Sequence, residues 1–169
     1  MPIKFQRTIT LLTAALAIIA VTVFMGMMSA VGQQVNQPQE LQPFTIQMSG
    51  TEEVPPVDTT ATGTPEFNLG TTGIDYQVSV SGMSGVTAAH IHSGNVGENV
   101  PVIVTLFKSD TPSNQTNGVL VKGTITAADL EGPMQGKQIS DLVSAMSSGG
   151  TYVNVHTEAN PNGEIRGQI

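Results

Sequence analysis

Three histidines are the only imidazole side chains of this chain, and they lie in two short segments, VTAAHIHSG and TYVNVHTEANPNGEIRGQI. Both segments are rich in β-branched residues, which favours strands. Because successive side chains of a strand point to opposite faces, His90 and His92 are predicted to share one face. Ala89 and Ile91 then take the other face. If the strand that carries His156 packs nearby, three nitrogen donors converge into a set suited to zinc or copper rather than calcium or magnesium.

A second interpretation of these histidines needs no metal. Neutral imidazoles often fill polar corners at the end of a sheet, where their nitrogens form hydrogen bonds with the backbone or other side chains. This structural role stays open beside the metal site. A metal would also need a fourth ligand, for which water, Glu98 and Glu158 are all candidates by their place in the sequence.

The charge distribution restricts the kinds of partner. The chain has 169 residues, 11% of them charged, and acidic residues outnumber basic ones. All 13 acidic residues follow the apolar N-terminal stretch, but the basic residues that follow it are only Lys108, Lys122, Lys137 and Arg166. Such an acidic surface offers no footprint for a phosphate backbone and is repelled by anionic lipid headgroups. We expect no nucleic-acid partner, and a partner, if there is one, among extracellular or cell-envelope proteins.

Residues 1–32 are predicted to be a signal peptide or a membrane anchor. Lys4 and Arg7 form a basic start, and residues 9–28 then run without a charge, long enough to cross a bilayer as an apolar helix. By the positive-inside rule, everything after this helix lies outside the cytoplasm. Small residues at positions 29, 30 and 32 fit a cleavage site, but the apolar run is longer than that of a usual signal peptide. Secretion and anchoring in the membrane by an uncleaved segment both remain open.

Cysteine is absent from the chain. An exported domain without cysteine has no disulfides, so its core, a metal or its neighbours must stabilise it. The absence also excludes thiolate metal sites, iron–sulfur clusters and cysteine nucleophiles. The sequence contains no GxSxG elbow, phosphate-binding P-loop or dinucleotide fingerprint either. We therefore expect a binding module more than an enzyme.

Residues 33–43 (QQVNQPQELQP) form a polar linker that contains prolines, and the folded domain is expected to span residues 44–169. Within that domain, short segments rich in Val, Ile, Thr and aromatic residues alternate with clusters of Gly, Pro, Asn and Asp, which is typical of an all-β sandwich or barrel. The expected strands are Phe44–Ser49, Gly63–Leu69, Ile74–Ser81, Thr87–His92, Val100–Phe107, Val119–Ile125, Thr151–His156 and Glu164–Ile169.

Two connections between strands have helical patterns. Thr126–Asp129 begins with a threonine that has an acid three residues later, which is similar to a capping box and indicates one short turn. Ser140–Ser147 carries apolar residues at helical spacing and is followed by Gly149 and Gly150, which suit a C-terminal cap.

Four segments together resemble the CHRD domain, the module named after chordin that also occurs alone in exported microbial proteins. They are GTEEVPPVDTTATG, VTAAHIHSGNVGENVPVIVTLF, ITAADL and SGGTYVNVHTEANPNGEIRGQI, in that order. The resemblance spans residues 44–169 and implies a stand-alone exported member of the family. It implies fold and location more than activity, because the growth-factor binding of chordin is associated largely with its separate cysteine-rich modules.

A looser likeness concerns the histidines. The HxH strand followed by a distant VxVHxxA strand is similar to the copper-ligand arrangement of copper/zinc superoxide dismutases, which are eight-stranded Greek-key sandwiches. Transferred to this chain, the likeness makes His90 and His92 the paired copper ligands and His156 the third. The chain has no histidine left for a bridging ligand or a zinc site and lacks the cysteine pair of those enzymes. A binuclear site is excluded, and dismutation would have to run on a lone copper.

Two smaller patterns also lead to predictions. The prolines of Glu52–Val57 are expected to hold an extended strand at a sheet edge. Glu164 and Arg166 fall on one face of the last strand, which favours an exposed ion pair worth less than about 1 kcal/mol.

Taken together, the sequence predicts an all-β, Greek-key antiparallel β-sandwich of about eight strands with one or two short helical connectors, after an N-terminal apolar helix. The predicted function is an extracytoplasmic CHRD-type binding module with a mononuclear copper or zinc site formed by His90, His92 and His156. The alternatives are a metal-free interaction domain of the cell envelope or extracellular matrix and, third, a copper-dependent redox enzyme.

Overall fold

The three-dimensional arrangement comes from a computed structural model that describes residues 43–113 and 117–169. The predictions for residues 1–32, and for the linker up to residue 42, lie outside the described residues. Within the described part of the chain, no helix is long and apolar enough to span a membrane.

The described residues form nine strands, two of which are very short. The strands are β1 (Phe44–Thr45), β2 (Met48–Ser49), β3 (Thr62–Leu69), β4 (Ile74–Ser81), β5 (Val86–Ser93), β6 (Val102–Ser113), β7 (Asn117–Ile125), β8 (Thr151–Thr157) and β9 (Ile165–Gln168). Helical segments in the connections are the 3-10 helices η1 (Gly50–Glu52), η2 (Ala127–Asp129) and η3 (Gly132–Met134) and the α-helix α2 (Ile139–Ser147). The prediction of an all-β fold with short helical connectors is confirmed.

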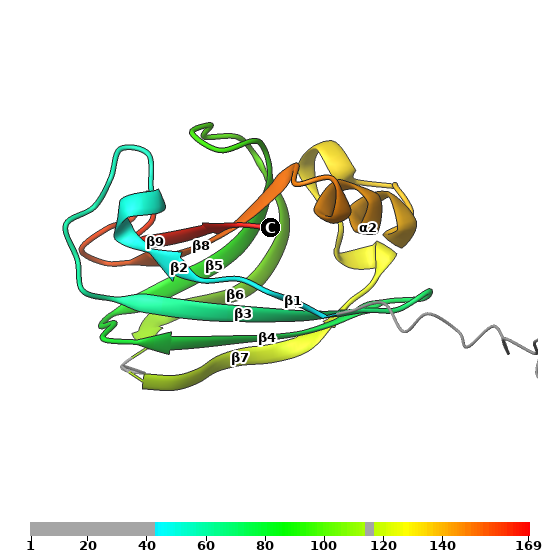
Figure 1. Ribbon diagram of the computed structural model, residues 1–169. Coiled ribbons are helices and arrows are strands. Elements are labelled where there is room, and N and C mark those ends of the chain that lie inside the picture. Colours follow the sequence, from blue (N-terminus) through cyan, green and yellow to red (C-terminus); the bar gives the residue numbers. More distant parts are fainter. Residues whose placement is uncertain (1–42, 114–116) are drawn as a thin grey trace, which may run out of the picture. The chain divides into compact units, whose positions relative to one another are not determined.

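All strand pairs are antiparallel, and the strand order is β6-β5-β8-β9-β2-β3-β4-β7, with β1 added beside β3. In Figure 1, β3, β4 and β7 form one layer, β5 and β6 pass behind it, and β8 and β9 continue this second part of the sheet above β3 in the view. The pairings of β4 with β7 and of β5 with β8 join strands far apart in the sequence, as in a Greek key. The terminal strands β6 and β7 also contact each other, so the sheet nearly closes on itself.

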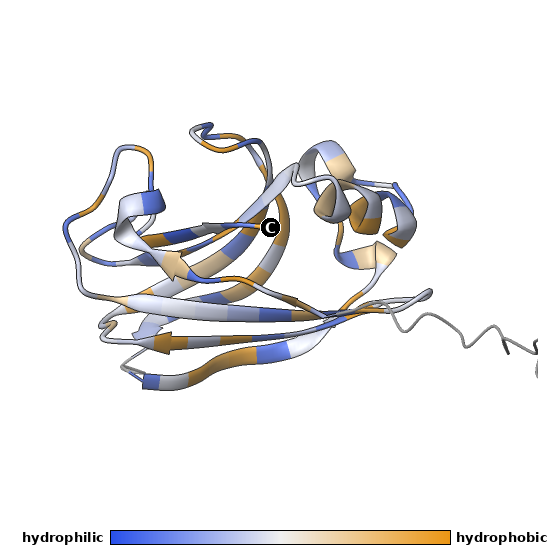
Figure 2. Ribbon diagram, viewed as in Figure 1, coloured by the Kyte–Doolittle hydropathy of each residue, from blue (hydrophilic) through white to orange (hydrophobic). Residues whose placement is uncertain are grey.

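The hydrophobic core lies between the two layers. Along β3, Gly63, Pro65 and Phe67 are buried, whereas Glu66 and Asn68 between and after them are exposed, as expected for a strand with one face in the core. Figure 2 shows the corresponding change of hydropathy along the strands. Burial of each large apolar side chain stabilises the fold by roughly 1.5 to 3 kcal/mol.

Both predicted helical connectors are present. The backbone N–H of Thr126 donates to the Asp129 carboxylate at 2.8 Å, so the predicted cap of η2 forms. Helix α2 lies at one end of the strands (Figure 1) and buries Leu142 and Met146. Gly149 follows this helix with φ +74°, a conformation that favours glycine.

Three details of the predicted strands differ from the structure. The first predicted strand divides into β1 and β2, which pair with β3 at separate places. The segment Glu52–Val57 is not an extended edge, because Gly50 O accepts hydrogen bonds from the N–H groups of Glu53 (3.2 Å) and Val57 (2.9 Å), which curl the chain. Strand β6 continues to Ser113 rather than Phe107, because bulges in its pairing with β5 accommodate the extra residues.

Candidate metal centre

The register of β5 against β8 brings the two histidine segments together. His90 lies opposite Asn154, His92 lies opposite Tyr152, and Ala88 lies opposite His156. Side chains that face each other across antiparallel strands are neighbours on the same face of the sheet. The two segments therefore contribute to one polar cluster, which meets the condition that the strand of His156 packs beside that of His90 and His92.

The opposite face of the same strands belongs to the core. Ala89 and Ile91 on β5, and Val153 and Val155 on β8, are fully buried. The predicted separation of apolar and histidine faces is confirmed. A one-residue slip of either strand would place the histidines in the core, so the apolar residues help to hold the histidines in place.

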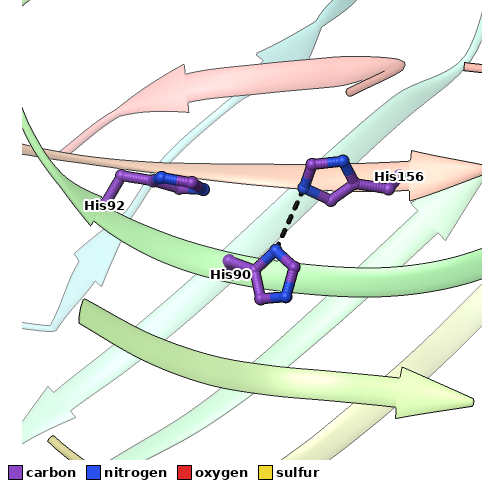
Figure 3. A group of neighbouring side chains, drawn as sticks. All are labelled: His90, His92 and His156. Atoms are coloured by element: carbon purple, nitrogen blue, oxygen red, sulfur yellow. Dashed lines mark hydrogen bonds between the residues drawn. The ribbon is translucent and has the colours of Figure 1, made fainter. Parts of the chain in front are cut away.

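The three imidazoles converge, as Figure 3 shows. Nδ1 of His90 lies 3.0 Å from Nε2 of His156, and one nitrogen from each ring falls in a group whose members lie within 4.8 Å of one another. Nitrogens bound at about 2.0 to 2.1 Å to one tetrahedral ion would lie roughly 3.4 Å apart. The close pair already has nearly that separation, and the wider pairs would have to draw together when an ion binds.

Backbone carbonyls determine which nitrogen of two rings carries the proton. Nδ1 of His92 lies 2.7 Å from Val100 O, and Nδ1 of His156 lies 3.0 Å from Pro161 O. A carbonyl oxygen only accepts, so each Nδ1 is the N–H that donates to it. In the neutral rings Nε2 then carries the lone pair. Metal-binding histidines typically have this arrangement, with the other ring nitrogen bonded to a backbone carbonyl or a carboxylate.

Burial keeps the histidines neutral. Burial, together with the smaller effect of positive charge on His156, His92 or Lys108, lowers the pKa of His90 to about 4. Burial also lowers the pKa of His92, against the opposing effect of its hydrogen bonds. The pKa of His156 is lowered by burial too, despite its bond to Pro161. Neutral imidazole is the form that binds a metal, so the rings are available near neutral pH.

Asn154 is a member of the cluster that the sequence analysis did not single out. Its side chain is buried, and Oδ1 lies 3.1 Å from Nε2 of His92 and 3.0 Å from Nε2 of His156. Because side chains alternate along β8, Asn154 lies on the same face as His156. Only the pairing with β5 shows that it lies between the rings.

Tyr152 and Arg166 support His92 from the side. The Tyr152 ring stacks on the His92 ring with centroids 4.7 Å apart and an interplanar angle of 1°. The guanidinium carbon of Arg166 lies 3.4 Å from the centroid of the Tyr152 ring. Arg166 also donates to Glu98 O at 2.8 Å and to Asn95 O at 3.1 Å, so it ties the loop after β5 to β9. This stack limits the rotation of the His92 ring.

The prediction of an exposed ion pair between Glu164 and Arg166 is wrong, because both side chains are buried. The Glu164 carboxylate accepts hydrogen bonds from the hydroxyls of Thr59 (2.9 Å) and Thr157 (2.7 Å). Buried charged groups need such partners, and the interior of a small sandwich supplies them from neighbouring strands and loops.

A surface depression of about 500 Å³ opens onto the cluster. Apolar side chains and amides surround two of the histidines there, and the lining residues are Val54, Pro55, His92, Asn99, Val100, Pro101, Tyr152, Asn154, His156 and Asn162. An ion or a small molecule can therefore reach His92 and His156 from solvent.

The carboxylates that the sequence offered as fourth ligands lie elsewhere. Glu98 accepts hydrogen bonds from the backbone and side-chain nitrogens of Asn95 at 2.9 and 3.2 Å and so orders its own loop. The Glu158 side chain lies against Gly85, on the far side of His156 along β8. Among the described residues, the convergent group comprises the three histidines and no carboxylate.

Glu53 is a second buried group that the sequence analysis missed. Burial raises the pKa of this carboxyl to about 7, against the lowering effects of Arg166 and of the Val54 backbone. Its Oε1 atom is buried and accepts no hydrogen bond from any described residue. A glutamate in the run EEVPPV has the sequence context of an exposed loop, and only the turn at η1 directs it inward.

Comparison with known protein families gives a match to the whole described domain. A family model described as the CHRD domain matches residues 44–169, which include every described strand and helix. No curated protein and no solved structure match the chain.

Proposed function

The chain belongs to the CHRD domain family, and from this premise we propose that it is an extracytoplasmic binding module whose histidine cluster holds one copper or zinc ion. The observation that carries the proposal is the convergence of His90, His92 and His156 in one small volume. The hydrogen bonds of two of these rings to backbone carbonyls leave their Nε2 lone pairs directed at that volume.

The kind of ion follows from the donors. Imidazole nitrogen suits copper and zinc, whereas calcium and magnesium prefer carboxylate and carbonyl oxygens. The convergent group offers nitrogen and no carboxylate. Three protein ligands with a position open to solvent suit a site for a single ion. The chain also has no fourth histidine that could bind a second ion.

The location outside the cytoplasm rests on the sequence. The basic start and the apolar run of residues 9–28 support export, with or without cleavage. The domain contains no cysteine, so a bound ion would supply a cross-link between β5 and β8 that exported domains of this size often obtain from disulfides.

A metal-free interaction domain is the second candidate, and the Asn154 side chain is the observation that favours it. A carboxamide turned with its NH2 group toward the rings would donate to Nε2 of both His92 and His156. The cluster would then be satisfied without an ion, and the domain would act through its surface alone on a protein of the envelope or matrix.

Metal content separates these two candidates. The purified chain is incubated with excess zinc or copper, dialysed, and its bound metal is measured by elemental analysis. We expect one ion per chain for the wild type, none for His156→Ala, and one for Glu158→Gln, which removes a nearby carboxylate outside the cluster. Equal metal in the wild type and in His156→Ala would exclude this site.

The same material tests for redox activity. A lone copper beside an open depression resembles half of a dismutase site, but no second metal site accompanies it among the described residues. Fold-level likeness is weak support for chemistry. We expect the copper-loaded chain to consume superoxide no faster than free copper at the same concentration. A rate that is clearly faster and lost in His156→Ala would establish an enzyme instead.

A further inference from the structure

A fourth polar atom belongs to the cluster. Asn154 lies opposite His90 across the β5–β8 pair and two residues before His156, so its side chain leaves the sheet on the same face. Its terminal atom lies 3.1 Å from Nε2 of His92 and 3.0 Å from Nε2 of His156. A single carboxamide end therefore touches the lone-pair nitrogens of two rings at once.

The contact between Asn154 and the two rings is repulsive or attractive depending on whether the carboxamide oxygen or the NH2 group faces them. With the oxygen toward the rings, three lone-pair atoms face one another and repel. Two arrangements remove this repulsion: a cation among the three atoms, or a half-turn of the carboxamide that presents its NH2 group. The half-turn needs almost no extra space, because the oxygen and the NH2 group are similar in size.

We propose that Asn154 is a two-state partner of the histidine site. When the site is empty, its NH2 group donates one hydrogen bond to Nε2 of His92 and one to Nε2 of His156. When the site is filled, its oxygen is the fourth ligand of the ion. The filled state rests on the proposed function, whereas the empty state does not.

Three of the distances in the cluster fit the filled state, whereas the wider histidine pairs, up to 4.8 Å, would draw together when the ion binds. Three contacts among the four atoms have nearly the same length: His90 Nδ1 to His156 Nε2 at 3.0 Å, and Asn154 Oδ1 to His156 Nε2 at 3.0 Å and to His92 Nε2 at 3.1 Å. Ligands held at about 2.0 to 2.2 Å from one ion lie roughly 2.9 to 3.6 Å apart for angles between 90° and 109°. The ion would then have three nitrogens and one oxygen around it.

The empty state also has a structural consequence. An unpaired polar group that is buried costs roughly 1 to 3 kcal/mol, and Asn154 is buried. Donation to both rings satisfies the NH2 group and the two nitrogens together. His92 and His156 then each have both ring nitrogens bonded, one to a backbone carbonyl and one to the same amide, and His90 Nδ1 donates to Nε2 of His156 at 3.0 Å, so the cluster is ordered before an ion arrives.

Nuclear magnetic resonance on the full wild-type chain, labelled with 15N and 13C, tests the empty state. In the metal-free chain we expect scalar couplings across N–H···N hydrogen bonds between Asn154 Nδ2 and the Nε2 atoms of His92 and His156. Absence of both couplings, with each ring protonated on Nδ1, would overturn the empty state. This result does not depend on whether the chain binds any metal.

Zinc tests the filled state on the same sample. With one equivalent of zinc bound, we expect both couplings to vanish and the carboxamide carbon of Asn154 to shift, while that of Asn162, which lines the same depression, stays in place. Zinc bound with the couplings retained would overturn the filled state. If the wild type binds no zinc, the proposed function and the filled state fail together, and the empty state is judged by its own couplings.

A substitution checks the ligand role separately. Asn154→Asp keeps an oxygen in place and gives it a negative charge, so at pH 8 we expect zinc affinity to rise at least tenfold. Asn162→Asp adds the same charge to the same depression and is expected to change affinity less than threefold. Equal effects of the two substitutions would overturn direct ligation and leave only the general effect of charge.

Discussion

Nδ1 of His90 and Nε2 of His156 lie 3.0 Å apart although 66 residues separate them in the chain. The contact follows from the pairing of β5 with β8, which sets Ala88 opposite His156 and His90 opposite Asn154. The core residues behind these strands hold that register, because their side chains alternate with the polar ones. The packing of the sandwich is therefore what builds the histidine cluster.

Zinc should raise the melting temperature of the wild-type chain. An ion that binds only the folded state stabilises it by mass action, by about 2.7 kcal/mol when the free ion concentration is 100 times the dissociation constant. Differential scanning calorimetry with and without zinc measures the gain. We expect none for His90→Ala, and a wild-type melting temperature that zinc leaves unchanged would contradict the metal site.

Replacement of Tyr152 should loosen the site through His92. Tyr152→Leu removes the ring that stacks on His92 and that Arg166 covers, so we expect zinc affinity to fall roughly tenfold, or about 1.4 kcal/mol. Tyr152→Phe keeps the ring and should stay within threefold of the wild type. Isothermal titration calorimetry compares them, and equal losses for Leu and Phe would point to the hydroxyl rather than the stack.

Acid should destabilise the metal-free chain through the histidines. The pKa of His90 is about 4 in the folded chain and 6.5 without the fold, so between these values only the unfolded chain binds the proton. The free energy of unfolding therefore falls as pH drops from about 6.5 to about 4. Urea titrations at pH 7 and pH 5 measure this fall, and His90→Gln should make it smaller.

Glu53 should have the opposite effect on how the free energy of unfolding depends on pH. Burial raises the pKa of Glu53 from 4.5 to about 7, so between these values only the folded chain keeps the proton. The protonated Glu53 carboxyl contributes fully to the free energy of unfolding below pH 4.5, and this contribution is lost as the pH rises through about 7. Glu53→Gln removes this loss, so the same urea titrations should show a steeper rise in stability from pH 5 to pH 7. A slope identical to that of the wild type would show that this carboxyl ionises freely.

A side chain at position 163 should destabilise the fold. Its φ of +125° is unfavourable for other residues, and a Cβ here would overlap the Glu53 carboxyl. Gly163→Ala is expected to destabilise the fold by roughly 2 to 4 kcal/mol, from backbone strain and overlap together. Gly97→Ala is the matched control, because its φ is +83° but no atom of the described residues lies within 4 Å of the added carbon. Thermal unfolding compares the two, and equal losses would mean that the overlap is relieved.

Local patterns in the sequence predicted the strands well. Ile74–Ser81 has the predicted bounds, and the shared face of His90 and His92 follows from alternation alone. The capping residues also predicted both helical connectors, since a cap depends on residues only a few positions apart.

Features that depend on the pairing of strands far apart in the sequence were harder to predict. The packing of the whole sandwich decides that β5 pairs with β8 and not with β4. The sequence therefore could not show that His156 lies close to His90 and His92, and this proximity had to be assumed. The place of Asn154 between the rings and the inward turn of Glu53 depend on the same packing. Spacing suggested Glu98 as a ligand, whereas its nearest donors are in its own loop.

The X-ray absorption spectrum of the zinc- or copper-loaded chain at the metal edge reports the atoms that bind the ion. We expect one ion per chain with three imidazole nitrogens at about 2.0 to 2.1 Å, and no bound ion, hence no metal edge, in His156→Ala. A first shell of oxygen alone, or the same spectrum from His156→Ala, would contradict a site formed by His90, His92 and His156.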